Sequence, residues 1–153
     1  MIVADASALL EALLRTSVRR LFDSGQTLHA PHLVDLEVAQ VVRRYAAAGE
    51  LAAERGREVL ADLADFPMLR YPHGFLLPRI WELRGNLTGY DAVYVALAEV
   101  LGAPLLTRDR RLAGPSSAGR TRVNCARCSN SVRSTPAMTA FRCWSAPRSR
   151  YAR

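Results

Sequence analysis

The stretch Met-Ile-Val-Ala-Asp-Ala-Ser, residues 1–7, decides the fold that this chain is expected to adopt. Residues 2–5 form an apolar run that ends in Asp5, which predicts a buried first strand. Ser7 predicts the N-cap of a helix over about residues 8–15, whose leucines fall on one face. A buried strand followed directly by a helix is the opening unit of an α/β fold.

Strand and helix patterns alternate along the rest of the body. Further helices are predicted at 18–23, 33–48, 52–64, 74–84 and 89–101, the last one capped by Thr88. Further strands are predicted at 27–30, 66–71 and 103–107, and Pro67 places its strand at an edge or at a strand start. This alternation predicts an α/β fold with a mainly parallel central sheet that is flanked by helices.

Two sets of apolar residues stand out in the helices. The first set lies roughly on one face of the helix over 33–48 and consists of Leu33, Leu36, Val41 and Tyr45. The second set is aromatic and consists of Trp81, Tyr90 and Tyr94, which we expect in the core rather than in a platform for stacked bases.

The charge of the chain is divided unevenly. Half of the 153 residues are hydrophobic, which suits one globular domain, and the formal net charge is +7. Residues 1–113 carry 13 Arg and 14 Asp or Glu, whereas residues 114–153 carry 8 Arg and no acidic residue. No apolar run approaches the ~20 residues that a membrane-spanning helix needs, and no signal peptide is expected. A cytoplasmic protein without membrane contact is therefore the default expectation.

Four acidic residues follow apolar runs or stand near the start of a helix: Asp5, Glu37, Asp91 and Asp109. Ligands of open α/β sheets bind beyond the carboxyl ends of the strands, where such side chains would meet. Asp35 falls about 200° away from Glu37 around the helix and should face elsewhere. Taken singly, each acid also has an ordinary structural explanation. Asp5 would be a helix cap, Glu37 a solvated or ion-paired helix residue, Asp91 a residue that favours the helix dipole, and Asp109 a turn residue. Grouped carboxylates instead need a shared proton or a hard cation such as Mg²⁺ or Mn²⁺.

Four stretches carry a family resemblance. They are Ile-Val-Ala-Asp-Ala-Ser-Ala-Leu (2–9), Pro-His-Leu-Val-Asp-Leu-Glu-Val-Ala (31–39), Leu-Thr-Gly-Tyr-Asp-Ala-Val-Tyr-Val-Ala-Leu-Ala-Glu (87–99) and Pro-Leu-Leu-Thr-Arg-Asp-Arg-Arg-Leu-Ala (104–113). In this order and spacing they resemble the PIN-domain ribonucleases, and more narrowly the VapC-type toxins of bacterial toxin–antitoxin pairs. The resemblance covers almost all of residues 1–113.

The resemblance implies a PIN-like fold and an endoribonuclease that acts as the toxin of a type II toxin–antitoxin system. It places the binding of one or two Mg²⁺ or Mn²⁺ ions, and with it catalysis, on Asp5, Glu37, Asp91 and Asp109. Ser7 and Thr107 match auxiliary positions that hold water or orient a carboxylate. The implied partners are an RNA substrate and a cognate antitoxin, and the resemblance allows a homodimer.

Basic residues near the proposed site are candidates for contacts with RNA phosphates: Arg43, Arg44, Arg108, Arg110 and Arg111. A solvated charged face is the alternative for each of them. Two other functions stay open. One is a catalytically inactive PIN-like interaction module, and the other is a nonspecific RNA-binding protein that acts through its basic tail.

Composition changes abruptly after Gly114. We expect a nuclease domain over 1–113 and an irregular Arg- and Ser-rich tail over 114–153. A last strand near 122–125 would extend the domain to about residue 125. The tail departs from the family's usual ending. Either it is a genuine basic extension, or it is translated from a reading frame that is shifted relative to that of the family members.

Other chemistries fit the residues poorly. A phosphatase of the haloacid dehalogenase type needs an acid two residues after Asp5, where this chain has Ser7. Cys125 and Cys128 have the spacing of a zinc knuckle, but Cys143 is the one further cysteine and no histidine follows. Free thiols are therefore expected.

Overall fold

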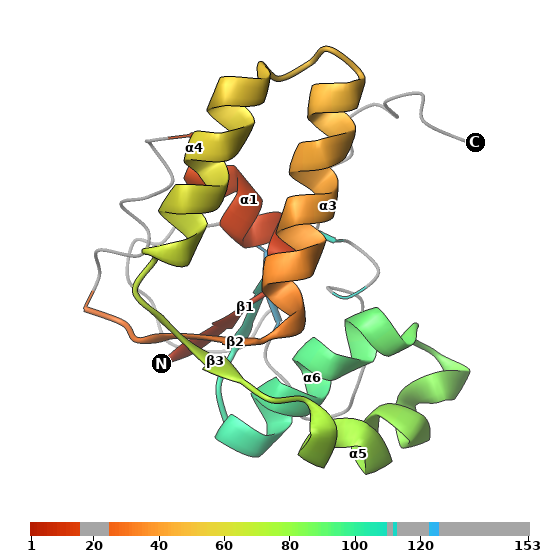
Figure 1. Cartoon of the computed structure of the whole chain (residues 1–153). Coiled ribbons are helices and arrows are strands. Elements are labelled where there is room, and N and C mark those ends of the chain that lie inside the picture. The colour runs from red at the N-terminus through yellow and green to blue at the C-terminus, as the bar shows by residue number, and fades with distance from the viewer. Residues whose placement is uncertain (16–24, 110–111, 113–122, 126–153) are drawn as a thin grey trace.

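A computed structural model describes residues 1–15, 25–109, 112 and 123–125 of the chain (Figure 1). Its centre is a five-stranded sheet in the order β3-β2-β1-β4-β5, and every neighbouring pair of strands is parallel. The strands are β1 (Ile2–Ala4), β2 (Leu28–Pro31), β3 (Met68–Tyr71), β4 (Leu105–Thr107) and β5 (Val123–Cys125). The predicted α/β class and the parallel sheet are confirmed.

Helices connect these strands. They are α1 (Ala6–Leu14), α3 (Leu33–Ala47), α4 (Ala53–Ala64), α5 (Leu77–Glu82) and α6 (Gly89–Leu101), and short 3₁₀ turns η1 (Gly74–Leu76) and η2 (Leu83–Gly85) flank α5. Figure 1 shows α1, α3 and α4 packed together on one side of the strands, and α5 with α6 on the other. None of the described helices is long and apolar enough to pass through a lipid bilayer.

The central strands bring distant parts of the chain together at the carboxyl ends of the strands. Val3 pairs with Leu105 and Ala4 with Leu106, so β1 and β4 run side by side in register. Because the strands are parallel, the residues that follow β1, β2 and β4 all emerge at the carboxyl ends of the strands, on one side of the sheet. Asp5 follows β1 directly, and it is here that a ligand site is expected.

Helix α6 passes through the core. Seven consecutive residues of it are buried, from Ala92 to Ala98, because the helix packs on β1, β2 and β4 while α5 covers its other side. Thr88 caps its first turn as predicted, and Gly102 ends it with a positive φ of 58°. The predicted helix over 89–101 is confirmed.

The start of α1 differs from the prediction. Asp5, not Ser7, is the N-cap, and α1 begins at Ala6. Asp5 keeps the extended backbone of the strand, with φ −86° and ψ 170°, so its carboxylate reaches the backbone N–H of Ala8. Ser7 lies inside the first turn instead, where its hydroxyl is free to contact Asp5.

The segment predicted as one helix over 74–84 is three short pieces. The backbone makes a 3₁₀ turn at Gly74–Leu76, one short α-helix and a second 3₁₀ turn. Pro78 lies at the first positions of α5, where its missing N–H costs nothing. The proline therefore starts a new helix rather than kinking a long one.

Three of the four residues predicted on one face of α3 are partly buried and pack against the core: Leu33, Val41 and Tyr45. The buried residues of α3 are Val34, Val38 and Val42, spaced four apart and packed into the core. Leu36 by contrast is 71% exposed. The helix thus carries two apolar stripes, and the valines face the core because they lie on the side turned toward the strands and α4.

The aromatic prediction holds for one residue of three. Tyr94 is buried at 2% exposure, whereas Trp81 and Tyr90 are 67% and 64% exposed. Trp81 lies on α5, which has no buried residue of its own, and it stacks under the guanidinium of Arg84. Tyr90 stands in the first turn of α6, before the helix enters the core.

Strands β3 and β5 occupy the two edges of the sheet. The edge position of β3 agrees with the expectation from Pro67, and β5 agrees with the expected last strand near 122–125. The helix predicted at 18–23 lies outside the described residues, as do 113–122 and 126–153, which hold nearly all of the expected tail. The division into a domain and a tail stays a prediction.

Candidate active site

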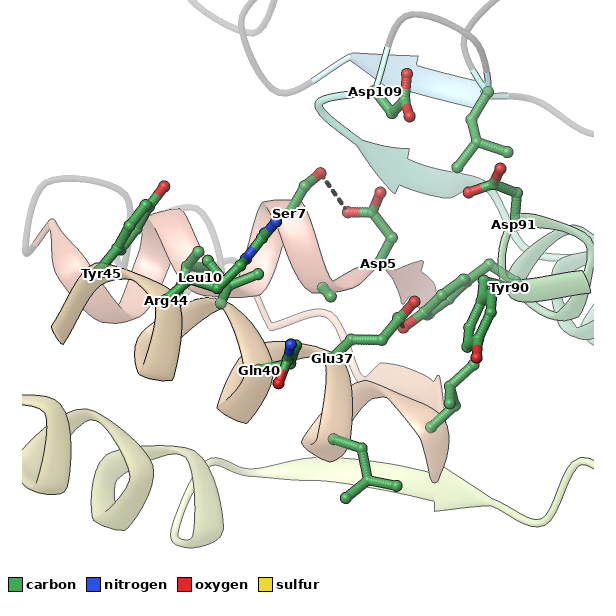
Figure 2. Close-up of a pocket in the computed structure, with 16 residues that line it drawn as sticks. Asp5, Ser7, Leu10, Glu37, Gln40, Arg44, Tyr45, Tyr90, Asp91 and Asp109 are labelled. Atoms are coloured by element: carbon green, nitrogen blue, oxygen red, sulfur yellow. Dashed lines mark hydrogen bonds between the residues drawn. The ribbon is translucent and has the colours of Figure 1, made fainter. Parts of the chain in front are cut away.

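A pocket of about 820 Å³ opens at the edge of the sheet where the strands end (Figure 2). Helices α1 and α3 form its walls, and the first turn of α6 and the segment after β4 close one end. All four predicted acids line it: Asp5, Glu37, Asp91 and Asp109. The other lining residues are Ala6, Ser7, Leu10, Leu33, Leu36, Gln40, Val41, Arg44, Tyr45, Tyr90, Tyr94 and Leu112. Figure 2 shows the acids gathered at one end and Arg44 and Tyr45 at the other.

Asp5 is the most enclosed of the four acids, with 5% exposure. Its Oδ1 accepts hydrogen bonds from the Ser7 hydroxyl at 2.7 Å and from the Ala8 N–H at 2.9 Å. Its Oδ2 accepts from the hydroxyl of Thr107, at the end of the neighbouring strand β4. Both predicted auxiliary residues, Ser7 and Thr107, therefore contact the Asp5 carboxylate.

Glu37 faces the pocket from α3, as the angular argument predicted. The hydroxyl of Tyr94 donates a hydrogen bond to its Oε2. Asp35 points elsewhere: Arg70 on β3 holds its carboxylate at 2.9 Å, and the same guanidinium donates to the carbonyl of Leu63. The two acids of one helix turn are thereby divided between the pocket and a structural ion pair.

Asp91 reaches the pocket from the first turn of α6. The hydroxyl of Thr88 donates to its Oδ2 at 2.8 Å, and the Asp91 N–H donates back to the same hydroxyl at 3.2 Å. Its position near the helix N-terminus favours a negative charge. Thr88 thus starts the helix and orients the acid with one side chain.

Asp109 belongs to the segment that follows β4. Its backbone N–H donates to the Thr107 hydroxyl at 2.9 Å, and the preceding N–H, of Arg108, donates to the Ser7 hydroxyl at 3.0 Å. Ser7 and Thr107 therefore each contact Asp5 and also a backbone amide of this segment. They join the ends of β1 and β4 into one unit.

The four carboxylates act on one another electrostatically. Burial raises the pKa of Asp5, and the charge of Asp109 raises it further, against the lowering effect of the hydrogen bonds from Thr107, Ala8 and Ser7. Burial likewise raises the pKa of Glu37, with added repulsion from Asp5 and Asp91 and opposition from the Tyr94 hydrogen bond. The repulsions run from Asp109 through Asp5 and Glu37 to Asp91, so a positive charge among them would be stabilising.

This donor set suits a hard divalent cation, because it offers carboxylate oxygens from four different elements. Among the described residues, however, no three His, Cys, Asp or Glu side chains are already grouped closely enough to hold a metal ion. Three of the acids are turned toward hydroxyl donors of their own: Thr107 and Ser7 for Asp5, Tyr94 for Glu37 and Thr88 for Asp91. The four acids share one pocket but do not form a closed coordination shell.

The arginines proposed for RNA contacts have different surroundings. Arg44 lines the pocket, whereas Arg43 is exposed on α3 and donates to Gln40 at 3.0 Å. Arg108 is only 25% exposed and lies 2.8 Å from the Glu11 carboxylate on α1, which makes it a bridge between α1 and the segment after β4. Arg110 and Arg111 lie outside the described residues.

The sequence reasoning missed two kinds of pocket residue. The residues predicted as the apolar face of α3 in fact line the pocket: Leu33, Leu36, Val41 and Tyr45. Tyr94 was predicted as plain core, although its hydroxyl contacts Glu37. Its position three residues after Asp91, on a helix that was expected to approach the acids, was the available signal.

Comparisons with known proteins agree with this architecture. The family model of the PIN domain matches residues 2–115. Ribonuclease VapC9 of Mycobacterium tuberculosis is 48% identical over 118 residues, which cover 77% of this chain and 93% of the relative. Ribonuclease VapC1 of the same organism is 41% identical over 116 residues, covering 72% and 87%.

Solved structures share the fold. The crystal structure of PAE2754 from Pyrobaculum aerophilum superposes with a TM-score of 0.62 at 28% identity and covers 81% of each chain. VapBC2 from Rickettsia felis, bound to a DNA fragment from its promoter, gives a TM-score of 0.60 at 13% identity over 82% of this chain and 98% of the other. The family match, the close relatives and the shared fold together show that this chain belongs to the PIN-domain family, and within it to the VapC-type ribonucleases.

Proposed function

We propose that the chain is the toxin of a toxin–antitoxin pair and an endoribonuclease that depends on a divalent cation. The observation that carries this proposal is the line of mutually repelling carboxylates in one pocket, in a chain 48% identical to a VapC ribonuclease. Asp5, Glu37, Asp91 and Asp109 would hold Mg²⁺ or Mn²⁺, as one or two ions. Such an ion supplies an activated water and stabilises the charge that develops on the phosphate.

The chain's own residues supply position and charge. Asp5 stands at the centre of the site, and its three donors keep its two oxygens in fixed directions. Ser7 and Thr107 tie it to the backbone that carries Asp109, so the two acids hold their relative positions. We propose auxiliary rather than chemical roles for these two hydroxyl groups. Their contacts with Asp5 are direct, whereas nothing requires either hydroxyl to attack phosphorus.

RNA would lie along the pocket. Arg44 lies at the end of the pocket opposite the acids and offers a guanidinium for a phosphate oxygen. Tyr90 is 64% exposed beside Asp91 and offers a ring face on which an unpaired base can stack. An RNA strand that contacts both residues would cross the acidic end of the pocket.

A cognate antitoxin is the proposed protein partner. Solved relatives in fold include a toxin–antitoxin complex from Klebsiella pneumoniae with a TM-score of 0.56 at 18% identity, covering 76% of this chain and 94% of the other. The apolar residues beside the acids, such as Leu36 and Val41, offer a surface that a protein segment can cover. Membership of the VapC group supports the same partner.

The test is cleavage of purified RNA by the full chain with Mg²⁺ or Mn²⁺ and with EDTA. Discrete fragments that require the cation are expected from the natural chain. Asp5→Asn should abolish them while the far-ultraviolet circular dichroism spectrum stays unchanged. Full metal-dependent activity in Asp5→Asn would remove Asp5 from the site.

The same experiment separates the two alternatives. An inactive interaction module would leave the RNA intact under all conditions. Binding driven by the Arg-rich tail would retain RNA without cutting it, and retention would decline at higher salt and in a chain that ends at residue 125. Cleavage by both the full and the shortened chain would place the activity within residues 1–125.

A further inference from the structure

One polar atom interrupts the buried face of α6. The seven buried residues of this helix, Ala92 to Ala98, are all aliphatic except Tyr94. Tyr94 is 2% exposed, so its hydroxyl has been removed from water and needs partners inside the protein. A phenylalanine would fill nearly the same apolar volume without that requirement. The hydroxyl therefore calls for an explanation beyond packing.

The Tyr94 hydroxyl joins α6 to another element that forms the pocket, α3. It donates to Oε2 of Glu37 on α3. Tyr94 and Asp5 both line the pocket to which Glu37 belongs. One side chain of α6 thus links the core helix to the carboxylate of Glu37 on α3, which Figure 2 shows facing Asp5 across the pocket.

The direction of the hydrogen bond to Glu37 is settled by charge. A phenol hydroxyl offers one proton and an ionised carboxylate oxygen offers none, so the Tyr94 hydroxyl donates and Oε2 of Glu37 accepts. The bond fixes one oxygen of the Glu37 carboxylate relative to the buried helix α6. It also occupies Oε2 and leaves Oε1 for another ligand.

We propose that Tyr94 is a positioning residue that holds Glu37 ready for the divalent cation. This inference rests on the proposed function. Tyr94 does not touch the ion or the RNA; it sets the orientation of a carboxylate that does. Groups that hydrogen-bond to a metal ligand typically change metal affinity or activity by about 10–100-fold when removed. A partner with a purely structural role would leave both quantities unchanged in the folded protein.

The test is Mn²⁺ binding to the full chain, measured by isothermal titration calorimetry, with Tyr94→Phe as the variant. We expect at least a tenfold rise in the Mn²⁺ dissociation constant, a matching fall in kcat for RNA cleavage at fixed Mn²⁺, and an unchanged KM for RNA. Tyr71→Phe is the matched control. Its hydroxyl contacts His29 at 2.8 Å, away from the pocket, so Mn²⁺ affinity should stay at the natural value.

A second variant asks whether Tyr94 acts through Glu37. Glu37→Gln removes the charge but keeps an oxygen for the Tyr94 hydroxyl, and Tyr94→Phe added to it should change Mn²⁺ affinity by less than twofold. A further tenfold loss in this background overturns the proposal. So does unchanged affinity in Tyr94→Phe, or loss of its folded circular dichroism spectrum. If the natural chain binds no Mn²⁺ and cuts no RNA, the proposed function itself has failed, and the role of Tyr94 fails with it.

Discussion

The hydroxyl of Thr107, at the end of β4, donates a hydrogen bond to the carboxylate of Asp5, which follows β1 and lies 102 residues earlier in the sequence. Thr107 is fully buried, and its oxygen also accepts the backbone N–H of Asp109 at 2.9 Å. Two acids of the pocket thus share one threonine. The site depends on the pairing of β1 with β4, because that pairing brings the threonine to Asp5.

Thr107→Val tests this relationship, because valine keeps the shape of threonine and removes the hydroxyl. It would deprive a buried carboxylate of a donor and an amide of its acceptor, at a cost of about 1–3 kcal/mol in the free energy of unfolding. The cleavage rate should fall by about 10–100-fold if the proposed cation site needs Asp5 held in place. Urea unfolding in EDTA and a cleavage assay measure the two effects. Thr107→Ser keeps the hydroxyl and should stay close to the natural chain; a valine variant equal to the serine variant would contradict the prediction.

The metal-free protein should become less stable relative to Asp5→Asn as the pH rises. Burial raises the pKa of Asp5 above its ordinary value of 3.8, so the folded state binds that proton more tightly than the unfolded state does. The stability from this carboxyl is complete below 3.8 and is lost as the pH rises through the raised value. Asparagine carries no charge and has no such loss.

The measurement is thermal unfolding in EDTA from about pH 4 to about pH 8, a range that covers the titration of raised carboxyls. The melting temperature of Asp5→Asn minus that of the natural chain should increase as the pH rises. Saturating Mn²⁺ should then stabilise the natural chain more than the variant, because binding to the folded state adds to stability. A constant difference at every pH would show that Asp5 carries no burial penalty.

Arg44 and Arg43 should differ in their effect on RNA binding. Arg44 lines the pocket, whereas Arg43 does not line it and donates a hydrogen bond to Gln40. In EDTA, where no cleavage occurs, Arg44→Gln should weaken binding of a single-stranded RNA and reduce the slope of log K against log salt by about 0.7. Arg43→Gln should leave the slope unchanged. Equal slopes for the two variants would mean that RNA does not follow the pocket.

Thr88 should matter both for stability and for the site. Thr88→Ala removes the N-cap of α6 and should cost about 1 kcal/mol of unfolding free energy, measured by urea denaturation. It also removes the donor to Asp91, so cleavage should slow by more than the lost stability explains. Thr88→Ser retains both contacts and serves as the control. Activity that is unchanged in the alanine variant would separate the cap from the site.

Local patterns in the sequence were sufficient for much of this fold. The apolar run that closes on Asp5 predicted β1, Thr88 and Gly102 predicted the ends of α6, and the angle between Asp35 and Glu37 predicted which of them faces the pocket. Each of these depends on neighbours in the chain and on a fixed helical or strand period. Backbone geometry alone is enough to derive them.

Packing between elements defeated the same reasoning elsewhere. Helix α3 has two apolar stripes, and periodicity alone does not say which stripe is fully buried. In the structure the stripe of valines is buried in the core, and Leu36 lies exposed at the pocket. The sequence predicted Ser7 as the cap of α1. In the structure Asp5 is the cap, and the Ser7 hydroxyl donates a hydrogen bond to the Asp5 carboxylate. The role of the Tyr94 hydroxyl depends on a glutamate 57 residues away, which no local pattern contains.

The sequence by itself determined the class of fold and the four acids that line the pocket, because strand ends and helix starts are local features. The two hydroxyl residues beside Asp5 were indicated by the resemblance of the sequence to its family. The tertiary structure alone decided how these groups meet. Parallel pairing of β1 with β4 set Thr107 against Asp5, and the packing of α6 in the core set Tyr94 against Glu37. Contacts of this kind join residues far apart in the chain, and only a packed core brings them within hydrogen-bonding distance.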